Sequence, residues 1–241
     1  MIIIPMAGLS SRFFKAGYTK PKYMLDLNGE SLFDTCLKSF SAYFESEHFL
    51  FIVRDVYATK DFVNERVKHL GIASYSVEAL SEETRGQAET VSLGLQAISN
   101  LEQPITIFNI DTIRPGFSFP DFDPREDSYL EVFKGTGDNW SFVKPVSDQS
   151  NEVILTTEKN PVSDLCCTGL YHFASASQFI AAYNYFLQLP KEQWDAGELY
   201  VAPLYNHIIR KHLPVKFHLI GRDEVIFCGT PTEYEALKTN L

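Results

Sequence analysis

The sequence is poor in cysteine and lacks long apolar runs, and each shortage excludes a class of protein. Its 4 cysteines show no C-x-x-C spacing, the usual spacing of zinc and redox sites, so we predict reduced thiols that act as small hydrophobes. The apolar N-terminal stretch, residues 1–9, is far shorter than the roughly 20 residues that span a membrane. It also lacks the basic region of a signal peptide. We therefore expect a cytoplasmic protein without a membrane partner.

The chain is also short of positive charge, with 21 Lys and Arg against 31 Asp and Glu and a net charge of −10 over 241 residues. Because phosphate neutralisation supplies much of the affinity for nucleic acid, this balance disfavours a nucleic-acid partner. A small anionic ligand senses only the local field and is not excluded. The length and a hydrophobic content of 45% predict one globular domain over residues 1–241.

Apolar runs alternate with helical patterns through the first half of the chain. The predicted strands are residues 2–4, 49–53, 75–78 and 105–110, and helices are expected after Ser31, over 62–70 and over 86–98. Ser31 and Asp34 have the spacing of a capping box, and Gly71 is a predicted helix C-cap. Such alternation predicts an α/β fold with a doubly wound, mostly parallel sheet, and ligands at the carboxyl ends of its strands.

The second half of the chain is less regular. Residues 112–128 are predicted to be a long loop, and strands are expected over 129–133, 140–146, 153–158, 165–173 and 215–220. Helices are expected near 179–186, over 200–212 and after Thr230, which has Pro231 and Glu233 in the positions of a strong helix start. We therefore expect a small antiparallel part, and divide the domain into halves at residue 111.

The loop after the first strand combines small residues with positive charge. Small residues in 7–11 let backbone amides approach an anion, and four cations follow within eleven positions: Arg12, Lys15, Lys20 and Lys22. In an acidic chain this local reversal of charge predicts a polyphosphate site.

Three other motifs of phosphate-binding or hydrolytic proteins do not fit this loop. G-x-G-x-x-G fails at Ser10 and Phe13, Walker A is absent, and the G-x-S-x-G hydrolase elbow has Arg12 in place of its last glycine.

The spacing of these motifs resembles the nucleotidyltransferases that make NDP-sugars and related metabolites. The family's A-G-x-x-S-R loop and later P-K match residues 7–12 and 21–22, and its base-contacting segment is similar to residues 85–90. Its N-x-D, E-K, G-x-Y-x-F and G-T-P elements resemble residues 109–111, 158–159, 169–173 and 229–231, in the family's order. The resemblance covers nearly the whole chain and implies a Rossmann-like, GT-A-like nucleotidyltransferase fold.

The resemblance also implies roles for individual residues. Arg12 would hold the leaving phosphates and Lys22 the α-phosphate, and Gly86 and Gln87 would contact the base. Asp111 would bind Mg²⁺, a cation that prefers oxygen ligands. The implied nucleotide cradle is formed by the amides of Ala7, Gly8, Leu9, Ser10 and Ser11. The implied acceptor residues are Glu158, Lys159, Gly169 and Tyr171.

One position departs from the family pattern. Many members carry a second metal-binding Asp two residues before the late glycine, and this chain has Phe227 there. Asp223 or Glu224 are alternatives for that ligand. Glu89 is either part of the base site or a charge on the helix surface, and the sequence leaves both interpretations open.

The resemblance implies a magnesium-dependent transfer of a nucleoside monophosphate from an NTP to a phosphorylated acceptor, with release of pyrophosphate. We favour CTP, with UTP and dTTP as alternatives. The acceptor is expected to be a sugar phosphate or another small phosphorylated metabolite, for capsule or surface polysaccharide synthesis. Because of Phe227, a nucleotide-binding regulatory module without turnover is the alternative, and a hydrolase is a more distant one.

Overall fold

The computed structural model describes residues 1–240, which form two compact units. One unit, here the parallel unit, comprises Ile2–Glu83, Phe108–Ser118 and the chain from Asp223 onward. The other, the antiparallel unit, comprises Thr84–Ile107 and Phe119–Arg222, with Met1. Each unit is therefore assembled from segments that are far apart in the sequence. The division of the chain at residue 111 stays a prediction.

Three parallel strands form the sheet of the parallel unit. They are β1 (Ile2–Met6), β4 (His48–Arg54) and β5 (Ser74–Leu80), in the order β1-β4-β5. Every residue of β1 is buried, as expected for a strand that is covered on both faces. These three predicted strands are confirmed. Two extend beyond both predicted ends and β1 beyond its second end, because backbone pairing continues past the apolar run. The fourth predicted strand, 105–110, ends earlier, at Phe108.

The helices of the parallel unit are α1 (Ser11–Lys15), α2 (Leu32–Leu37), α3 (Thr59–Leu70) and α7 (Pro231–Asn240). The capping box of Ser31 and Asp34 and the left-handed Gly71 cap are confirmed. The single helix expected after Ser31 is wrong in its second half. The chain leaves α-geometry and continues as a 3₁₀ turn, Lys38–Tyr43, with Phe40 outside helical angles, and still buries that ring.

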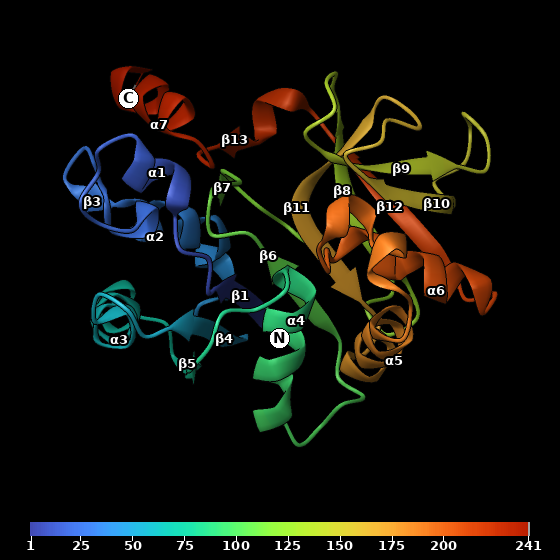
Figure 1. Ribbon diagram of the computed structural model, residues 1–241, viewed down its shortest axis with the longest axis horizontal. Coiled ribbons are helices and arrows are strands. Elements are labelled where there is room, and N and C mark those ends of the chain that lie inside the picture. The colour runs from blue at the N-terminus through green and yellow to red at the C-terminus, as the bar shows by residue number, and fades with distance from the viewer. Residues whose placement is uncertain (241) are drawn as a thin grey trace. The chain divides into compact units, whose positions relative to one another are not determined.

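The C-terminal helix α7 packs beside α1, the red and blue helices of Figure 1. Phe13 and Tyr234 meet edge to face at 6.1 Å, and the Tyr18 hydroxyl donates to Glu235 at 2.5 Å. The Thr230 hydroxyl accepts from the Glu233 amide at 3.3 Å, which confirms the predicted helix start. Two short antiparallel pairs complete the unit: β2 (Asp26–Leu27) with β3 (Glu30–Ser31), and β7 (Thr112–Ile113) with β13 (Ile226–Phe227). The predicted loop 112–128 therefore begins with a strand.

The antiparallel unit contains a second group of strands. These are β6 (Ile105–Phe108, all but its last residue), β8 (Ser128–Lys134), β9 (Ser141–Pro145), β10 (Val153–Glu158), β11 (Leu165–Phe173) and β12 (Val215–Ile220). One path runs β10-β9-β11-β6, and β8 pairs with both β11 and β12. The β9, β10, β11 and β8 pairings are antiparallel, which confirms the antiparallel part expected from the sequence.

Three helices belong to the antiparallel unit: α4 (Gln87–Gly94), α5 (Ala176–Leu187) and α6 (Tyr205–Arg210). The helix predicted over 200–212 is shorter, because residues 202–204 form a 3₁₀ turn around Pro203, which lacks an amide donor. The helix predicted over 86–98 likewise ends in a 3₁₀ turn, Leu95–Ala97. Within residues 1–240, no helix has both the length and the apolar character needed to cross a bilayer.

Candidate active site

The loop that follows β1 holds a conformation that few residues other than glycine adopt. Ser10 lies in the left-handed region, with φ of 53°, and its carbonyl accepts from the Phe13 amide at 2.9 Å at the start of α1. Its hydroxyl accepts from the Lys22 amide at 3.1 Å. Ser10 therefore joins the small-residue loop to the P-K segment. Among the described residues no histidine or carboxylate is bonded to this hydroxyl.

Lys22 and Asp111 come together in the parallel unit. Lys22 Nζ donates to Asp111 Oδ2 at 2.5 Å, and the two side chains are 19% and 25% exposed. The backbone fixes both groups, since Lys22 begins a 3₁₀ turn and the Asp111 carbonyl accepts from the Cys228 amide at 2.8 Å. Both side chains of this half-buried ion pair still contact solvent.

The late G-T-P segment lies against Asp111. A methyl group added at Gly229 would lie 3.0 Å from Asp111 Oδ2, so the absence of a side chain there lets the carboxylate approach the backbone. Phe227 pairs with Thr112 between β13 and β7, which sets the register of this approach. Asp223 and Glu224 are exposed in a 3₁₀ turn ahead of β13, and their role as alternative ligands stays a prediction.

Three further cations of the predicted polyphosphate site are exposed and belong to the same unit. They are Arg12, Lys15 and Lys20. Throughout residues 1–240 no carboxylate forms an ion pair with any of the three. Their charges are therefore not compensated by the protein, which suits the binding of a multiply charged anion.

Asp111 fits a magnesium site in which one protein carboxylate and the substrate phosphates coordinate the ion. Over the described chain, no three His, Cys, Asp or Glu side chains gather as a metal cage. Mg²⁺ usually keeps several waters and binds through one or two carboxylates plus phosphate oxygens, so a single accessible carboxylate suffices. The second carboxylate expected from the family resemblance is replaced by Phe227, whose side chain brings no oxygen.

The predicted base-contacting segment lies in the antiparallel unit at the start of α4. The backbone amide and the Nε of Arg85 donate to the Glu89 carboxylate at 2.5 and 2.8 Å. These bonds hold the pKa of Glu89 below its usual value despite partial burial. Glu89 thus binds Arg85 and the loop that carries it, and a part for it in the base site stays a prediction. Gln87 begins α4 and is half-buried.

Gly86 lies where this segment meets a distant part of the unit. Its φ is 152°, and a methyl group there would lie only 2.5–2.8 Å from backbone atoms of Leu199. Two hydrogen bonds close the contact, from the Leu199 amide to the Arg85 carbonyl at 3.1 Å and from the Ala88 amide to the Leu199 carbonyl at 2.9 Å. Only glycine permits this approach of two backbones.

Two predicted acceptor residues, Glu158 and Tyr171, meet Ser141 where β9, β10 and β11 lie side by side. Glu158 is buried and accepts from the Ser141 hydroxyl, and that hydroxyl lies 3.4 Å from the Tyr171 hydroxyl. Burial raises the pKa of Glu158 above its usual value, although Ser141 and Lys159 oppose the shift. Gly169, with φ of 96°, sits in an irregular stretch of β11 that brings Tyr171 into place.

Lys159 is held at both its backbone and its side chain. Its φ is 54°, in the left-handed region, and its amide donates to the Trp140 carbonyl at 2.8 Å. Its Nζ donates to the Tyr200 hydroxyl at 2.6 Å. The preceding Glu158 amide donates to Asp195 at 3.0 Å. A strained backbone that the surroundings maintain is typical of functional positions.

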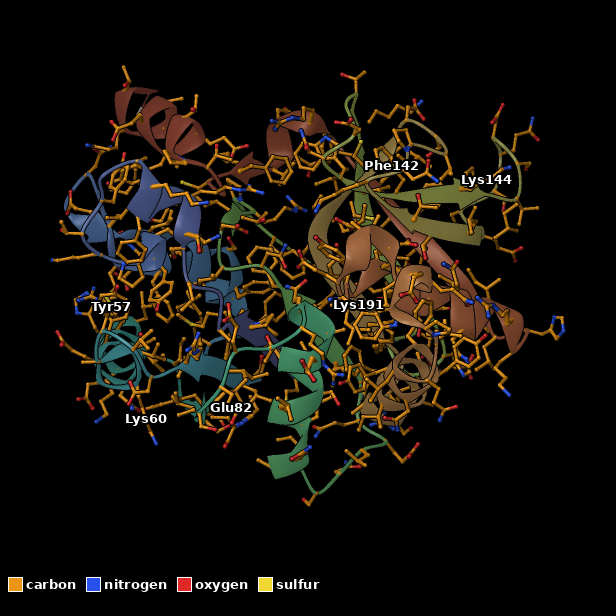
Figure 2. All side chains as sticks on the ribbon, in the orientation of Figure 1. Tyr57, Lys60, Glu82, Phe142, Lys144 and Lys191 are labelled. Atoms are coloured by element: carbon orange, nitrogen blue, oxygen red, sulfur yellow. The ribbon has the colours of Figure 1, made fainter. Side chains whose placement is uncertain are left out.

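Sequence reasoning missed the residues that hold the predicted ones in place, namely Ser141, Asp195, Leu199 and Tyr200. Strand pairing and loop docking create these contacts, and no local pattern signals them. Lys144, the charged residue of β9, is exposed (Figure 2) and takes no part in the cluster around Glu158. Since successive side chains of a strand alternate in direction, Lys144 and Ser141 point to opposite faces.

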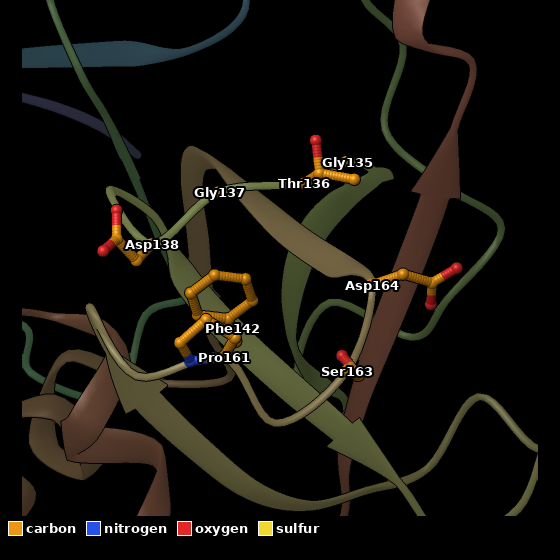
Figure 3. Close-up of a pocket in the computed structure, with 8 residues that line it drawn as sticks. All are labelled: Gly135, Thr136, Gly137, Asp138, Phe142, Pro161, Ser163 and Asp164. Carbon is orange, nitrogen blue, oxygen red and sulfur yellow. The ribbon is translucent and has the colours of Figure 1, made fainter.

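A cavity of about 590 Å³ opens elsewhere in the antiparallel unit. It is lined by the β8–β9 loop at 135–138, by Phe142, and by the β10–β11 loop at Pro161 and 163–164. Figure 3 shows Phe142 and Pro161 next to each other, with Asp138 and Asp164 on either side. Phe142 follows Ser141 directly, so it too points away from the Ser141 face of β9. This cavity is therefore separate from the Glu158 cluster.

Solved structures show what the whole chain is similar to. A nucleoside-diphosphate-sugar pyrophosphorylase from Vibrio cholerae RC9 is 55% identical, with coverage of 99% of this chain and 100% of that chain, at a TM-score of 0.96. The inositol-1-phosphate CTP transferase of T. maritima is 16% identical, with 99% and 94% coverage and a TM-score of 0.74. A UDP-glucose pyrophosphorylase complexed with UDP-glucose is 14% identical, with 99% and 97% coverage and a TM-score of 0.74.

These similar structures are nucleotidyltransferases whose names refer to sugar or inositol phosphates and their products. No protein-family model and no curated protein matches the chain. The 55% identical relative, covered end to end, shows that the chain belongs to the sugar-1-phosphate nucleotidyltransferase family. The predicted family and the predicted α/β fold class are thereby confirmed.

Proposed function

We propose that this chain transfers a nucleoside monophosphate from an NTP to a phosphorylated acceptor and releases pyrophosphate. The observation that carries the proposal is the pair of Lys22 Nζ and Asp111 Oδ2 at 2.5 Å, with the exposed Arg12 in the same unit. These are a cation and a carboxylate at the positions that the family motif assigns to phosphate and metal. The 55% identical nucleoside-diphosphate-sugar pyrophosphorylase supports the same class of reaction.

The reaction requires little proton transfer by the protein. A phosphate oxygen of the acceptor is already anionic when it attacks the α-phosphorus, and the pyrophosphate leaves from the opposite side. Catalysis then consists mainly of alignment and of preorganised charge around the phosphates. In this proposal Lys22 contacts the α-phosphate, Arg12 holds the leaving phosphates, and the amides of residues 7–11 cradle the nucleotide.

Magnesium is the proposed cofactor, and Asp111 is its proposed protein ligand. When bound, the ion would supply positive charge to the phosphate oxygens. The Asp111 side chain is 25% exposed and lies against Gly229, which has no side chain to block it, so one of its oxygens can turn toward solvent. Lys22, which now binds this carboxylate, would then be free to bind a phosphate oxygen.

The acceptor site is proposed at Glu158, Lys159, Gly169 and Tyr171 of the antiparallel unit. The Lys159 ammonium would bind the acceptor phosphate. The buried Glu158, already a hydrogen-bond acceptor for Ser141, would accept from a hydroxyl of the acceptor. A phosphate-binding cation beside a buried acceptor group suits a sugar phosphate or another polyhydroxylated phosphate.

The base is proposed to be read by Gly86 and Gln87, with CTP favoured over UTP and dTTP. The close backbone approach of Gly86 to Leu199 and the Arg85–Glu89 contacts fix this segment before a nucleotide arrives, which favours selective contacts with the base edge. We propose surface polysaccharide synthesis, capsule included, as the use of the product.

The test is a pyrophosphate-release screen of CTP, UTP, dTTP, ATP and GTP against glucose 1-phosphate, inositol 1-phosphate and glycerol 3-phosphate with Mg²⁺. We expect turnover with one nucleotide and one acceptor class, greatest with CTP. Nucleotide binding by calorimetry without turnover on any acceptor would support instead the inactive regulatory module suggested by Phe227. The absence of both nucleotide binding and turnover would overturn both proposals.

A further inference from the structure

One segment of the antiparallel unit, Glu198–Tyr200, touches both the base-contacting segment and Lys159. Its Leu199 exchanges two backbone hydrogen bonds with Arg85 and Ala88, at 3.1 and 2.9 Å. The next residue, Tyr200, receives the hydrogen bond of the Lys159 ammonium. We refer to residues 198–200 as the bridging segment. The backbones of Gly86 and Leu199 are in tight contact, because a methyl group added at Gly86 would overlap Leu199. A shift of the bridging segment would therefore move the residues that it contacts on both sides.

Tyr200 binds the Lys159 ammonium in two ways. The hydroxyl accepts from Nζ at 2.6 Å, and Nζ also lies 4.8 Å from the centre of the ring. An ammonium has three N–H donors, so the contact with the hydroxyl uses one and leaves two for an anion. Since the lysine side chain is long and flexible, a fixed ammonium binds a phosphate with less loss of side-chain freedom.

The charge states of the pair agree with this arrangement. The hydrogen bond to Tyr200 is the largest contribution that raises the pKa of Lys159, so the ammonium stays charged at neutral pH. Burial raises the pKa of Tyr200, although Lys159 opposes the shift, so the hydroxyl stays neutral. The pair is thus a cation with a neutral acceptor, and its net positive charge remains available to a phosphate.

We propose that Tyr200 is a positioning residue that aims the Lys159 ammonium at the acceptor phosphate, and that the bridging segment couples its position to the base-contacting segment. The inference rests on the proposed function, which gives Lys159 the acceptor phosphate. Its consequence is that nucleotide and acceptor each improve the binding of the other, since both require the same placement of residues 198–200.

The first test is Tyr200→Phe, which removes the hydroxyl and keeps the ring. The matched control is Tyr185→Phe, because the Tyr185 hydroxyl accepts from Arg210 and its ring also faces that cation, at 5.0 Å. With CTP and the most active acceptor of the screen, Tyr200→Phe should raise the acceptor KM by about three- to tenfold, the usual effect of losing one hydrogen bond. The nucleotide KM measured at low acceptor concentration and the melting temperature should change little.

Equal acceptor KM values in the wild type, Tyr200→Phe and Tyr185→Phe would overturn the positioning role. A lower melting temperature with proportional losses in all kinetic constants would show a structural role and would overturn it as well. For the coupling, the acceptor KM of the wild type should fall as CTP rises toward saturation, and this fall should shrink in Tyr200→Phe. An acceptor KM that does not depend on CTP in the wild type would overturn the coupling.

A readout without turnover separates failure of the inference from failure of the proposed function. Glucose 1-phosphate should protect Lys159 from reductive methylation, as measured by mass spectrometry. Half-protection in Tyr200→Phe should need about three- to tenfold more of it than in the wild type. If the wild type has no turnover, the proposed function fails while this measurement still decides the inference. Equal protection in both proteins overturns the role of Tyr200.

Discussion

Lys22 and Asp111 form an ion pair, Nζ to Oδ2 at 2.5 Å, although 89 positions separate them along the chain. Each group belongs to a different motif of the family, so the fold brings together what the sequence shows only as separate elements. Without a nucleotide the two charges compensate each other. A bound polyphosphate would replace the carboxylate as the partner of the ammonium.

Lys22→Met should therefore lower kcat strongly while leaving the fold intact. Removal of one preorganised charge at a reacting phosphate typically costs about 10²–10³ in kcat. Steady-state pyrophosphate release measures the effect. Lys38→Met is the control, since Lys38 makes a comparable pair with Glu30 on the exposed surface. A Lys22→Met enzyme with the rate of the control would contradict the assignment of Lys22 to the α-phosphate.

Asp111→Asn should change how activity depends on magnesium. An amide oxygen is a weaker ligand than a carboxylate, so half-maximal rate should require at least about tenfold more Mg²⁺, with a lower maximum. Removal of the ion with EDTA should abolish pyrophosphate release in the wild type, and added Mg²⁺ should restore it. Asp26→Asn, at an exposed carboxylate of β2, serves as the control. An unchanged Mg²⁺ titration in Asp111→Asn would remove Asp111 from the metal site.

How far the sequence could predict this molecule depended on the range of the interactions. The Ser31–Asp34 capping box and the Gly71 cap are local, and the structure confirms both. The change to 3₁₀ geometry around Phe40 is not local, because tertiary packing of that ring against Phe49, Phe108 and Phe117 accompanies it. Helical periodicity alone predicts a continuous helix there.

The same distinction applies to the candidate site. The loop of residues 7–12 carries its signal in consecutive letters, and so its chemistry could be predicted. Ser141 reaches Glu158 only because β9 and β10 pair in one register, and Tyr200 reaches Lys159 only because a loop docks beside it. Glu89 illustrates the limit: its four-residue spacing from Arg85 was visible, but its bond to the Arg85 amide depends on the loop conformation.

Glu158→Gln should stabilise the protein more at neutral than at acidic pH. Burial raises the pKa of Glu158 above 4.5, so the folded state keeps its proton longer than the unfolded chain. The stability contributed by this group therefore falls as pH rises from about 4.5 through the raised pKa, and a neutral amide avoids the loss. Each kcal/mol of relieved penalty should raise Tm by about 2–4 °C in a chain of this size.

Thermal unfolding of Glu158→Gln and the wild type between pH 4 and 8 measures this difference, with the exposed Glu152→Gln as control. We expect the gap in Tm to widen with pH for Glu158→Gln alone. The same variant should lose acceptor affinity, since a carboxylate accepts more strongly than an amide. A Tm difference that narrows as pH rises would contradict the sign of the pKa shift.

The four cysteines should be unreactive in the folded protein. All are buried as free thiols, and burial, with Asp111 nearby, raises the pKa of Cys228 to about 12. Because only the thiolate reacts, a disulfide reagent at pH 8 should label no thiol rapidly in the native state and 4 after unfolding in guanidinium. One fast-reacting thiol in the native protein would show that a cysteine is accessible.

Gly86→Ala should be more damaging than glycine replacement at other left-handed positions. The new methyl would lie 2.5–2.8 Å from the Leu199 backbone, so the contact between residues 85–88 and the bridging segment would have to open. Gly71→Ala is the control, since Gly71 has φ of +76° but nothing within 4 Å of the added carbon. It reports the cost of the backbone angle alone, about 1–2 kcal/mol.

We expect Gly86→Ala to add about 1–3 kcal/mol to that cost in chemical denaturation, because a backbone cannot yield as a flexible side chain does. It should also raise the KM for both nucleotide and acceptor, whereas Gly71→Ala should leave both unchanged. Equal stability losses in the two variants would mean that Leu199 moves aside at no cost. In that case the backbone contact at Gly86 would not fix the base-contacting segment, and the selectivity for the base would have to come from side chains such as Gln87.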